Sequence, residues 1–244
     1  MIKAYHRAEN IDHALQLLTR SGVKTAVLAS QSLVDARLDE SVDEVVDLQA
    51  LGLNRIQAAG ARLTVEALVT LQTLLEHAAV PAALRALIRA EANHTFRNMR
   101  SISGLLCTTD AESQLVAALL VCAAEVNIES ARGSRQMALA EFLNDIDAAL
   151  NGGILTTVTF DVSGQMAAAH VARTPADKPI VAAVARRGPD GRVLLALSGV
   201  ARTPLLVEAA QVEQLQPAGD FRGSPLYRRE MALTLSRRVL DELG

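Results

Sequence analysis

The sequence predicts an α+β protein built from a larger domain in two parts and a smaller C-terminal domain. Stretches with helical spacing of apolar residues alternate with short apolar runs bounded by turn residues, which is typical of mixed helices and strands. The 244 residues are half hydrophobic, enough to bury a core without a metal or a disulfide. Glycine, proline and polar residues cluster over 163–178, which marks a domain boundary. We therefore expect a domain over 1–165, with a small α/β unit at about 1–54 and a mixed α+β unit at 55–165, followed by a small α+β domain over 170–244.

Composition and charge exclude several classes of protein. The chain carries 24 Lys and Arg against 27 Asp and Glu, a net charge of −3, so a groove that binds nucleic acid is not expected. Cys107 and Cys122 have no metal-ligand partner at useful spacing, which disfavours a zinc site and a disulfide scaffold. The polar start lacks the apolar stretch of a signal peptide, and the longest apolar run, Leu115–Ala124, has about half of the roughly 20 residues that a membrane helix needs. We expect a cytoplasmic protein with no nucleic-acid or membrane partner.

A helix and three strands are expected in and just after the small N-terminal unit. Apolar residues recur at helical spacing over 10–20, and Asn10 is a suitable N-cap for that helix. Short apolar or alternating runs predict strands at Thr25–Ala29, Glu44–Leu48 and Arg55–Ala59. Strand, helix and strand in close succession are typical of a compact α/β unit.

The mixed unit is expected to begin with two helices. A capping pattern and leucines at helical spacing predict one over Thr64–Glu76, and a proline in the first turn supports another over Pro81–Ala92. Periodicity then lapses over Asn93–Ser113, which we interpret as a long polar connection of the functional or mobile kind. Leu115–Glu125 predicts a buried helix, or a helix that runs into a strand at Glu125–Glu129.

The rest of the chain is expected to contain a hairpin and further helices. The Gly-Pro-Asp-Gly turn is the signal for the hairpin, because these residues favour tight turns between strands. The expected elements are a short helix entered through Ala138–Phe142, a strand over Ile154–Phe160, a hairpin of 180–186 and 192–200 about the Gly188–Gly191 turn, and helices at about 204–214 and 226–243.

No motif of the common hydrolytic or nucleotide-triphosphate sites is present. The sequence has no Gly-x-Ser-x-Gly elbow, no His-Glu-x-x-His helix and no Walker loop. We interpret the two cysteines as small buried hydrophobic residues. The histidines are scattered, which is more typical of surface or structural residues than of a catalytic base; they are His6, His13, His77, His94 and His170. The sequence therefore predicts no catalytic residue and no metal site.

Two turns of small residues are the candidate binding elements. One follows a predicted buried strand and the other lies in the polar connection. Tight turns of small residues leave backbone N–H groups exposed, and a diphosphate can lie against them without a clash. Serine and glycine are also common turn formers, so each turn alone favours an ordinary loop. The candidates are Ala29, Ser30, Gln31, Ser32 and Leu33 in the first turn, and Ser101, Ile102, Ser103 and Gly104 in the second.

Short motifs in a fixed order run from one end of the chain to the other. They are Tyr5, Ala14–Leu18, Val27–Ala29, Gln31–Leu33, Val46–Leu48, Gly60-Ala61 with Thr64, Arg97-Asn98 with Ile102 and Gly104, Glu141-Phe142, and Gly223-Ser224 with Tyr227-Arg228. In this order they resemble the FAD-binding medium subunit of the molybdenum hydroxylases, the group of carbon monoxide dehydrogenase and xanthine dehydrogenase.

The resemblance implies a flavoprotein subunit of a larger oxidoreductase, with the two turns around the diphosphate of FAD. In that family the flavin relays electrons from iron–sulfur clusters on a small subunit to an acceptor, and substrate is oxidised at molybdenum on a large subunit. An iron–sulfur subunit and a molybdopterin subunit are therefore the implied partners in a heteromer, because this chain has neither cluster cysteines nor a domain of that size. Asp177 resembles a family element that precedes the last domain, and we expect it to be structural.

Both turns depart from the family's glycine-rich loops. The first is one residue shorter than the family's Ala-Gly-Gly-Gln-Ser and has no glycine. In the second, Arg100, Ser103 and Leu105 replace two glycines and an asparagine, and Arg100 offers a compensating charge. Serine in place of a glycine with positive φ costs on the order of 1 kcal/mol. Two functions follow: an FAD-binding electron-transfer subunit, or a flavin-free paralogue that serves as a structural, assembly or regulatory subunit.

Overall fold

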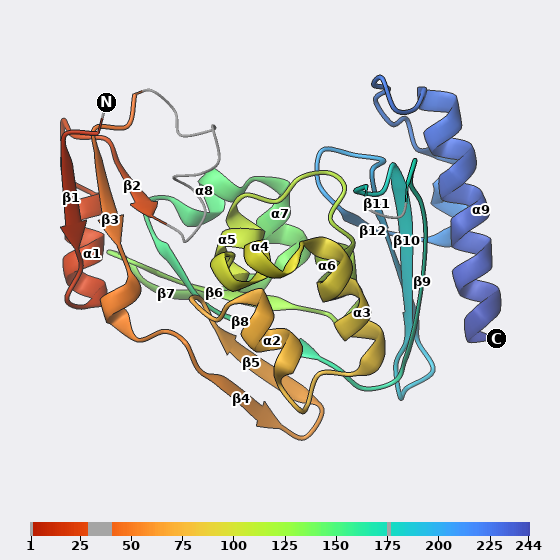
Figure 1. Cartoon of the computed structure of the whole chain (residues 1–244), viewed down its shortest axis with the longest axis horizontal. Helices are drawn as coiled ribbons and strands as arrows, with labels where there is room; N and C mark the ends of the chain where they lie inside the picture. Colours follow the sequence, from red (N-terminus) through yellow and green to blue (C-terminus); the bar gives the residue numbers. More distant parts are fainter. Residues whose placement is uncertain (1, 29–40, 175–176) are drawn as a thin grey trace.

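The computed structural model describes residues 2–28, 41–174 and 177–244. These residues form three units that follow one another along the long axis of the molecule (Figure 1). The units are built on sheets of three, five and four strands in chain order. This arrangement confirms the predicted α+β fold, with a small N-terminal unit, a mixed unit and a C-terminal unit.

The described residues of the N-terminal unit form a parallel sheet with a crossover helix. β1 (Ala4–Arg7) and β2 (Thr25–Leu28) both pair with β3 (Glu44–Asp47), in the order β1-β3-β2. α1 (Ile11–Leu18) connects the two outer strands, and the Asn10 side chain caps its first turn. The predicted helix and strands of this unit are confirmed. β1 was not predicted, because its residues alternate between half-buried and exposed and form no apolar run.

The mixed unit is built on an antiparallel sheet entered through a short 3-10 turn, η1 (Gln49–Leu51). Its strands, in the order in which they pair, are β4 (Ile56–Ala59), β5 (Arg62–Glu66), β8 (Ile154–Asp161), β6 (Glu125–Ser130) and β7 (Gly133–Ala138). Val65, Val158 and Val126 lie opposite one another on the three central strands, and all three are fully buried. This row forms the centre of the sheet's apolar face.

Seven helices of the described chain pack in this unit. They are α2 (Leu71–Glu76), α3 (Ala82–Glu91), α4 (His94–Met99), α5 (Ile102–Cys107), α6 (Gln114–Val121), α7 (Leu139–Asn144) and α8 (Ile146–Leu150). Every residue of α6 is buried, as expected for a helix that is apolar on all sides. Its core cluster also includes Val184 and Ala196 from the next sheet, so α6 joins the mixed unit to the C-terminal unit.

The C-terminal unit is a four-stranded antiparallel sheet covered by one long helix. The strands, in the order in which they pair, are β12 (Leu205–Val207), β11 (Val193–Ser198), β10 (Val181–Arg187) and β9 (Gln165–Val171). A 3-10 turn, η2 (Ala209–Gln214), leads to α9 (Pro225–Leu243), which packs on β9 and β10 at the far end of the molecule from β1 (Figure 1). The predicted hairpin and last helix are confirmed. No helix in the described ranges is long and apolar enough to cross a membrane.

The helix predicted over Thr64–Glu76 is wrong in its first half. Arg62–Glu66 forms β5, and the helix begins only at Leu71, capped by the side chain of Thr70. Leu63 and Val65 are buried on alternate positions, which is the period of a strand. The capping pattern at Thr64 gave the wrong prediction because pairing with β8 in the folded chain overrides a local helix signal.

The polar connection predicted over Asn93–Ser113 is also wrong. It contains α4 and α5, each capped by a side chain, Asn93 for the first and Ser101 for the second. Helices of six residues are too short to show a periodic apolar pattern and depend on packing for their stability.

Three further elements differ from the prediction. The helix expected at 204–214 is a short strand followed by a 3-10 turn, β12 and η2. β7 was not predicted, because its exposed residues carry no apolar alternation. β9 lies within the stretch 163–178 that we interpreted as a boundary, and it pairs with β10. The sheet of the C-terminal unit therefore begins at Gln165.

Candidate cofactor site

The first predicted binding turn cannot be placed. Ala29, Ser30, Gln31, Ser32 and Leu33 lie outside the described residues, which stop at Leu28 and resume at Ser41. Their role in binding FAD stays a prediction.

The second predicted turn forms the start of α5. Ser101 is the N-cap, and its hydroxyl oxygen accepts a hydrogen bond from the Gly104 N–H at 3.1 Å. Ser101, Ile102, Ser103 and Gly104 are all buried. The structure thus brings these four residues together as a capped helix start rather than as an open loop.

The backbone donors of this turn already have protein acceptors. The Ile102 N–H donates to the Val69 carbonyl at 2.9 Å, and the Ser103 N–H donates to the Ala67 carbonyl at 3.1 Å. The Ser103 hydroxyl donates to the same Ala67 oxygen at 2.7 Å. With Gly104 bonded to Ser101, none of these three N–H groups is left for a ligand, so in this arrangement they do not form a diphosphate cradle. Their contact with FAD stays a prediction.

Arg100 faces a buried carboxylate instead of an open cleft. Its guanidinium lies 3.7 Å from Glu91 and donates to the Thr108 hydroxyl at 3.3 Å. The Ser113 hydroxyl donates to Glu91 at 2.8 Å. Burial raises the pKa of Glu91, while the Ser113 hydrogen bond and the Arg100 charge oppose the increase. Arg100 is therefore paired with a carboxyl group of the protein itself, which was not foreseen from the sequence.

The cysteines and histidines show no arrangement for catalysis or metal binding within the described ranges. Burial raises the pKa of both thiols, Cys107 and Cys122, to about 12, so both are protonated at neutral pH. No cluster of three or more His, Cys, Asp or Glu that could hold a metal ion occurs among the described residues.

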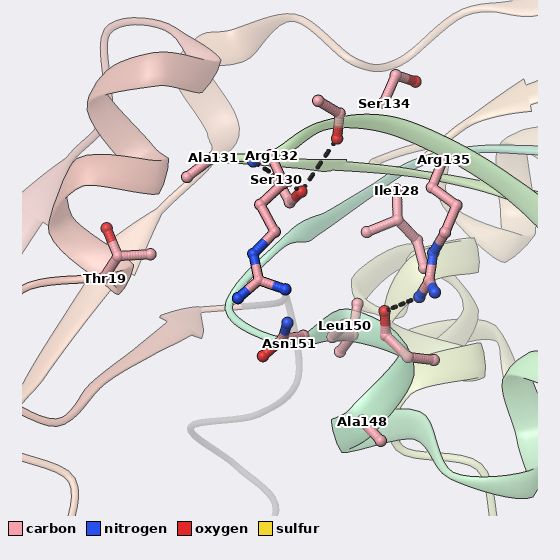
Figure 2. A pocket seen from close by; sticks show the side chains of 12 residues that line it. Thr19, Ile128, Ser130, Ala131, Arg132, Ser134, Arg135, Ala148, Leu150 and Asn151 are labelled. Carbon is pink, nitrogen blue, oxygen red and sulfur yellow. Dashed lines mark hydrogen bonds between the residues drawn. The ribbon is translucent and has the colours of Figure 1, made fainter.

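A cavity of about 490 Å³ lies where the N-terminal unit meets the mixed unit (Figure 2). One wall is the turn between β6 and β7, the opposite wall is the end of α8 with Asn151, and Thr19 at the end of α1 closes a side. Arg132 extends from the turn and Arg135 from β7, both toward the α8 end (Figure 2). This site was not predicted from the sequence. The Arg-Gly-Ser-Arg stretch after a predicted strand was a usable signal, because Gly133 has a φ of 110°, which favours glycine in a turn.

The C-terminal motif that supported the resemblance has a structural role. Ser224 caps α9, and Arg228 is buried with its guanidinium bonded to the carbonyls of Ile180 and Gly199 at 2.8 and 2.7 Å. Gly223 packs so closely against Tyr227 that an added Cβ would lie 3.0 Å from the ring. Asp177 also lies in a turn, where its N–H donates to the Thr174 carbonyl.

Known oxidoreductase chains share this fold over almost their whole length. A chain of carbon monoxide dehydrogenase from Hydrogenophaga pseudoflava is 19% identical, with a TM-score of 0.86 over 99% of this chain and 96% of that chain. A chain of quinoline 2-oxidoreductase from Pseudomonas putida 86 is 20% identical, with a TM-score of 0.84 over 100% and 97%. The uncharacterized protein YgfM of Escherichia coli K12 is 27% identical over 94% of this chain and 92% of its own length.

The sequence itself gives the family. The family described as the FAD binding domain in molybdopterin dehydrogenase matches residues 1–160. The chain therefore belongs to this family, and the class that the resemblance predicted, an FAD-binding subunit of molybdopterin-dependent dehydrogenases, is confirmed.

Proposed function

We propose that this chain is the flavoprotein subunit of a heteromeric molybdopterin dehydrogenase. It binds FAD and assembles in the cytoplasm with a separate iron–sulfur subunit and a separate molybdopterin subunit. FAD, when bound, supplies the redox chemistry by taking up electrons and passing them to an acceptor. The observation that carries this proposal is the family match over residues 1–160, and the fold shared with carbon monoxide dehydrogenase supports it.

The chemistry of the chain's own thiols supports the need for partners. Iron–sulfur clusters are held by cysteine thiolates, whereas Cys107 and Cys122 are protonated and lie within the core cluster or against it. In the proposed complex the clusters and the molybdenum therefore belong to other subunits. What this chain contributes is a set of three units on which a flavin and two partners are held.

The second function, a flavin-free structural, assembly or regulatory subunit, is supported by one specific observation. The N–H groups of Ile102, Ser103 and Gly104 donate to protein acceptors and offer a diphosphate no free donor. FAD binding through this turn requires those bonds to be exchanged. A flavin-free subunit requires no such change.

The visible spectrum of the purified full-length chain separates the two functions. A flavoprotein gives the yellow colour and the absorption bands of oxidised flavin, either as purified or after addition of excess FAD and removal of the unbound cofactor. A preparation that takes up no FAD from a large excess contradicts the first function and leaves the flavin-free subunit.

A glycine substitution tests whether the second turn takes part. Ser103→Gly removes the hydroxyl that donates to the Ala67 carbonyl and gives the turn the smaller residue of the family's loop. If the turn contacts FAD, this variant binds FAD several-fold more tightly than the wild type. Ser224→Gly, which alters another helix cap in the C-terminal unit, is the matched control and leaves FAD affinity unchanged.

The heteromer is tested by affinity purification of the tagged chain from its own cell. The proposal expects a cysteine-rich iron–sulfur protein and a long molybdopterin protein in the same complex. A chain that purifies alone under mild conditions contradicts the heteromer, whether or not it carries FAD.

A further inference from the structure

A second cavity lies in the C-terminal unit, beside β12 at the edge of the four-stranded sheet. Its volume is about 480 Å³, and its walls come from β11, β12, the start of η2 and the last part of α9. Its lining residues fall between Arg192 and Leu240, whereas the family match ends at residue 160. The family match therefore assigns this cavity no ligand.

Two opposite charges line the cavity at neighbouring positions. Leu195 pairs with Val207, and the same register continued by one residue places Glu208 opposite Leu194. Arg192 lies two residues before Leu194, so its side chain is on the same face of the sheet. Diagonal neighbours of this kind have Cβ atoms about 7 Å apart. Arg192 and Glu208 are also the charged members of the lining set.

The two charges are not paired with each other. Within the described ranges no ion pair joins Arg192 to Glu208, and the Arg192 side chain makes no hydrogen bond there. The Arg192 backbone is fixed, because its N–H donates to the Asp190 carboxylate at 3.1 Å and its carbonyl accepts from the Gly188 N–H at 2.9 Å. The Glu208 carboxylate accepts the Gln211 N–H at the start of η2. The pair therefore leaves room for a ligand that carries both signs of charge.

The remaining wall is largely apolar and sets a second requirement. Leu194, Leu206 and Leu240 line it, and Leu206 is 37% exposed. An apolar group placed against Leu206 removes that surface from water. The volume lies within the range of sites for small organic ligands. The occupant therefore has a carboxylate, an ammonium group close to it, and an apolar side chain.

We propose that this cavity binds a free α-amino acid with an apolar side chain, such as leucine. The Arg192 guanidinium binds the α-carboxylate, whose two oxygens match its paired N–H donors. The Glu208 carboxylate binds the α-ammonium group, and the side chain packs against Leu206 and Leu240. The predicted FAD turns contribute no residue to this lining, so the site is independent of the proposed function.

The test is calorimetry on the full-length chain with leucine and three probes that each lack one of its groups. The probes are 4-methylpentanoate without the ammonium group, 3-methylbutylamine without the carboxylate, and glycine without the apolar side chain. Leucine binds at least tenfold more tightly than each of the three, because only leucine makes all three contacts.

Two variants assign the two charges to their ligand groups. Arg192→Gln weakens leucine about tenfold and does not weaken 3-methylbutylamine, which has no carboxylate to lose. Glu208→Gln weakens leucine about tenfold and does not weaken 4-methylpentanoate, and its amide oxygen can still accept the Gln211 N–H. Arg202→Gln and Glu230→Gln are the matched controls, exposed and outside the cavity, and change nothing.

Several results overturn the inference. They are no binding of leucine at millimolar concentration, leucine that binds no more tightly than a probe lacking one group, and an equal loss in the control variants. Arg192→Gln carries the test if Glu208→Gln unfolds, because the Arg192 side chain supports no other residue of the described chain.

Titration with FAD separates this inference from the proposed function. A chain that takes up FAD but no leucine refutes only the amino-acid site. Leucine binding that depends on Arg192, in a chain that takes up no FAD, refutes only the flavoprotein.

Discussion

Arg228 and Arg132 are both arginines, but Arg228 is buried among protein acceptors and Arg132 is exposed to solvent. Arg228 is 4% exposed, and its guanidinium donates to the carbonyls of Ile180 and Gly199 and to the carboxylate of Asp220. Arg132 is exposed at the edge of a cavity and its side chain has no protein partner within the described chain. The Arg228 guanidinium connects α9 to the start of β10 and the end of β11. The Arg132 guanidinium connects no elements of the described chain.

The difference separates structural arginines from candidates for ligand binding. A buried guanidinium destabilises the fold unless acceptors replace its lost hydration, so the fold builds those acceptors around Arg228. An exposed guanidinium keeps its hydrating water and needs no protein acceptor, so its N–H donors remain available to an anion. The residue that carried the family motif is thus structural, and the residue with no motif is the candidate for binding.

Removing the buried arginine has the largest expected effect. Arg228→Met leaves two carbonyls and the Asp220 carboxylate without their donor, and we expect a loss of about 3 kcal/mol in the free energy of unfolding. Urea unfolding of the full chain, followed by circular dichroism, measures it. Arg132→Met is the control and changes the same quantity by less than about 0.5 kcal/mol. Equal losses in the two variants would break the distinction between the two settings.

Gly199 tests the acceptor side of the same cluster. Its φ is 79°, and an added Cβ would lie 2.0 Å from the Ile180 carbonyl oxygen, one of the Arg228 acceptors. Gly199→Ala therefore combines backbone strain with a clash, for an expected loss of about 2 to 3 kcal/mol. Gly191 has the same φ with no atom near its Cβ position, so Gly191→Ala loses only about 1 kcal/mol. If the two variants unfold at the same urea concentration, the clash makes no contribution.

Local patterns predicted most of the fold where burial produced a periodic signal. The helix at α1 and the hairpin of β10 and β11 follow from apolar spacing and a Gly-Pro-Asp-Gly turn, and α9 lies where the last helix was predicted. β5 was taken for a helix because the capping pattern at Thr64 and the leucines from Leu68 onward were interpreted as one helix, and only the pairing of Val65 with Val158 shows the strand. Short or exposed elements such as α5 and β7 gave no periodic pattern at all.

The candidate site was less predictable than the fold. The sequence placed Ser101–Gly104 in one turn, but whether their N–H groups are free depends on Ala67 and Val69, which approach only in the folded chain. Arg132 and Arg135 lie on a hairpin that the sequence analysis did not expect, and the cavity they face is closed by the distant Thr19. Contacts between units cannot be read from local spacing.

Ser103 differs from both arginines, because its hydroxyl is a buried donor that already has the Ala67 carbonyl as acceptor. Its hydroxyl donates to the Ala67 carbonyl, which also accepts the Ser103 N–H. Ser103→Ala removes one of these two bonds, and we expect a loss of about 1 kcal/mol in the urea unfolding experiment. Ser134→Ala, which removes an exposed hydroxyl bond to Asn127, is the control and costs less than about 0.5 kcal/mol. A neutral Ser103→Ala would mean that the turn is not held closed by this hydroxyl.

Asp220 gives the smallest effect and sharpens the account of Arg228. The hydrogen bond from Arg228 lowers the pKa of the Asp220 carboxyl below its usual 3.8, which means that the folded state favours the ionised form. The stability that this carboxylate adds is therefore fully present above the unfolded value and is lost as the pH falls through the lower, folded pKa. The difference in unfolding free energy between the wild type and Asp220→Asn should stay constant from neutral pH down to about pH 5 and shrink below about pH 4.

In the Arg228→Met background the same comparison should show a weaker dependence on pH, since the main cause of the shift is gone. If the difference in unfolding free energy between the wild type and Asp220→Asn persists unchanged in strong acid, Arg228 binds Asp220 as a neutral hydrogen-bond acceptor, as it binds the two carbonyls.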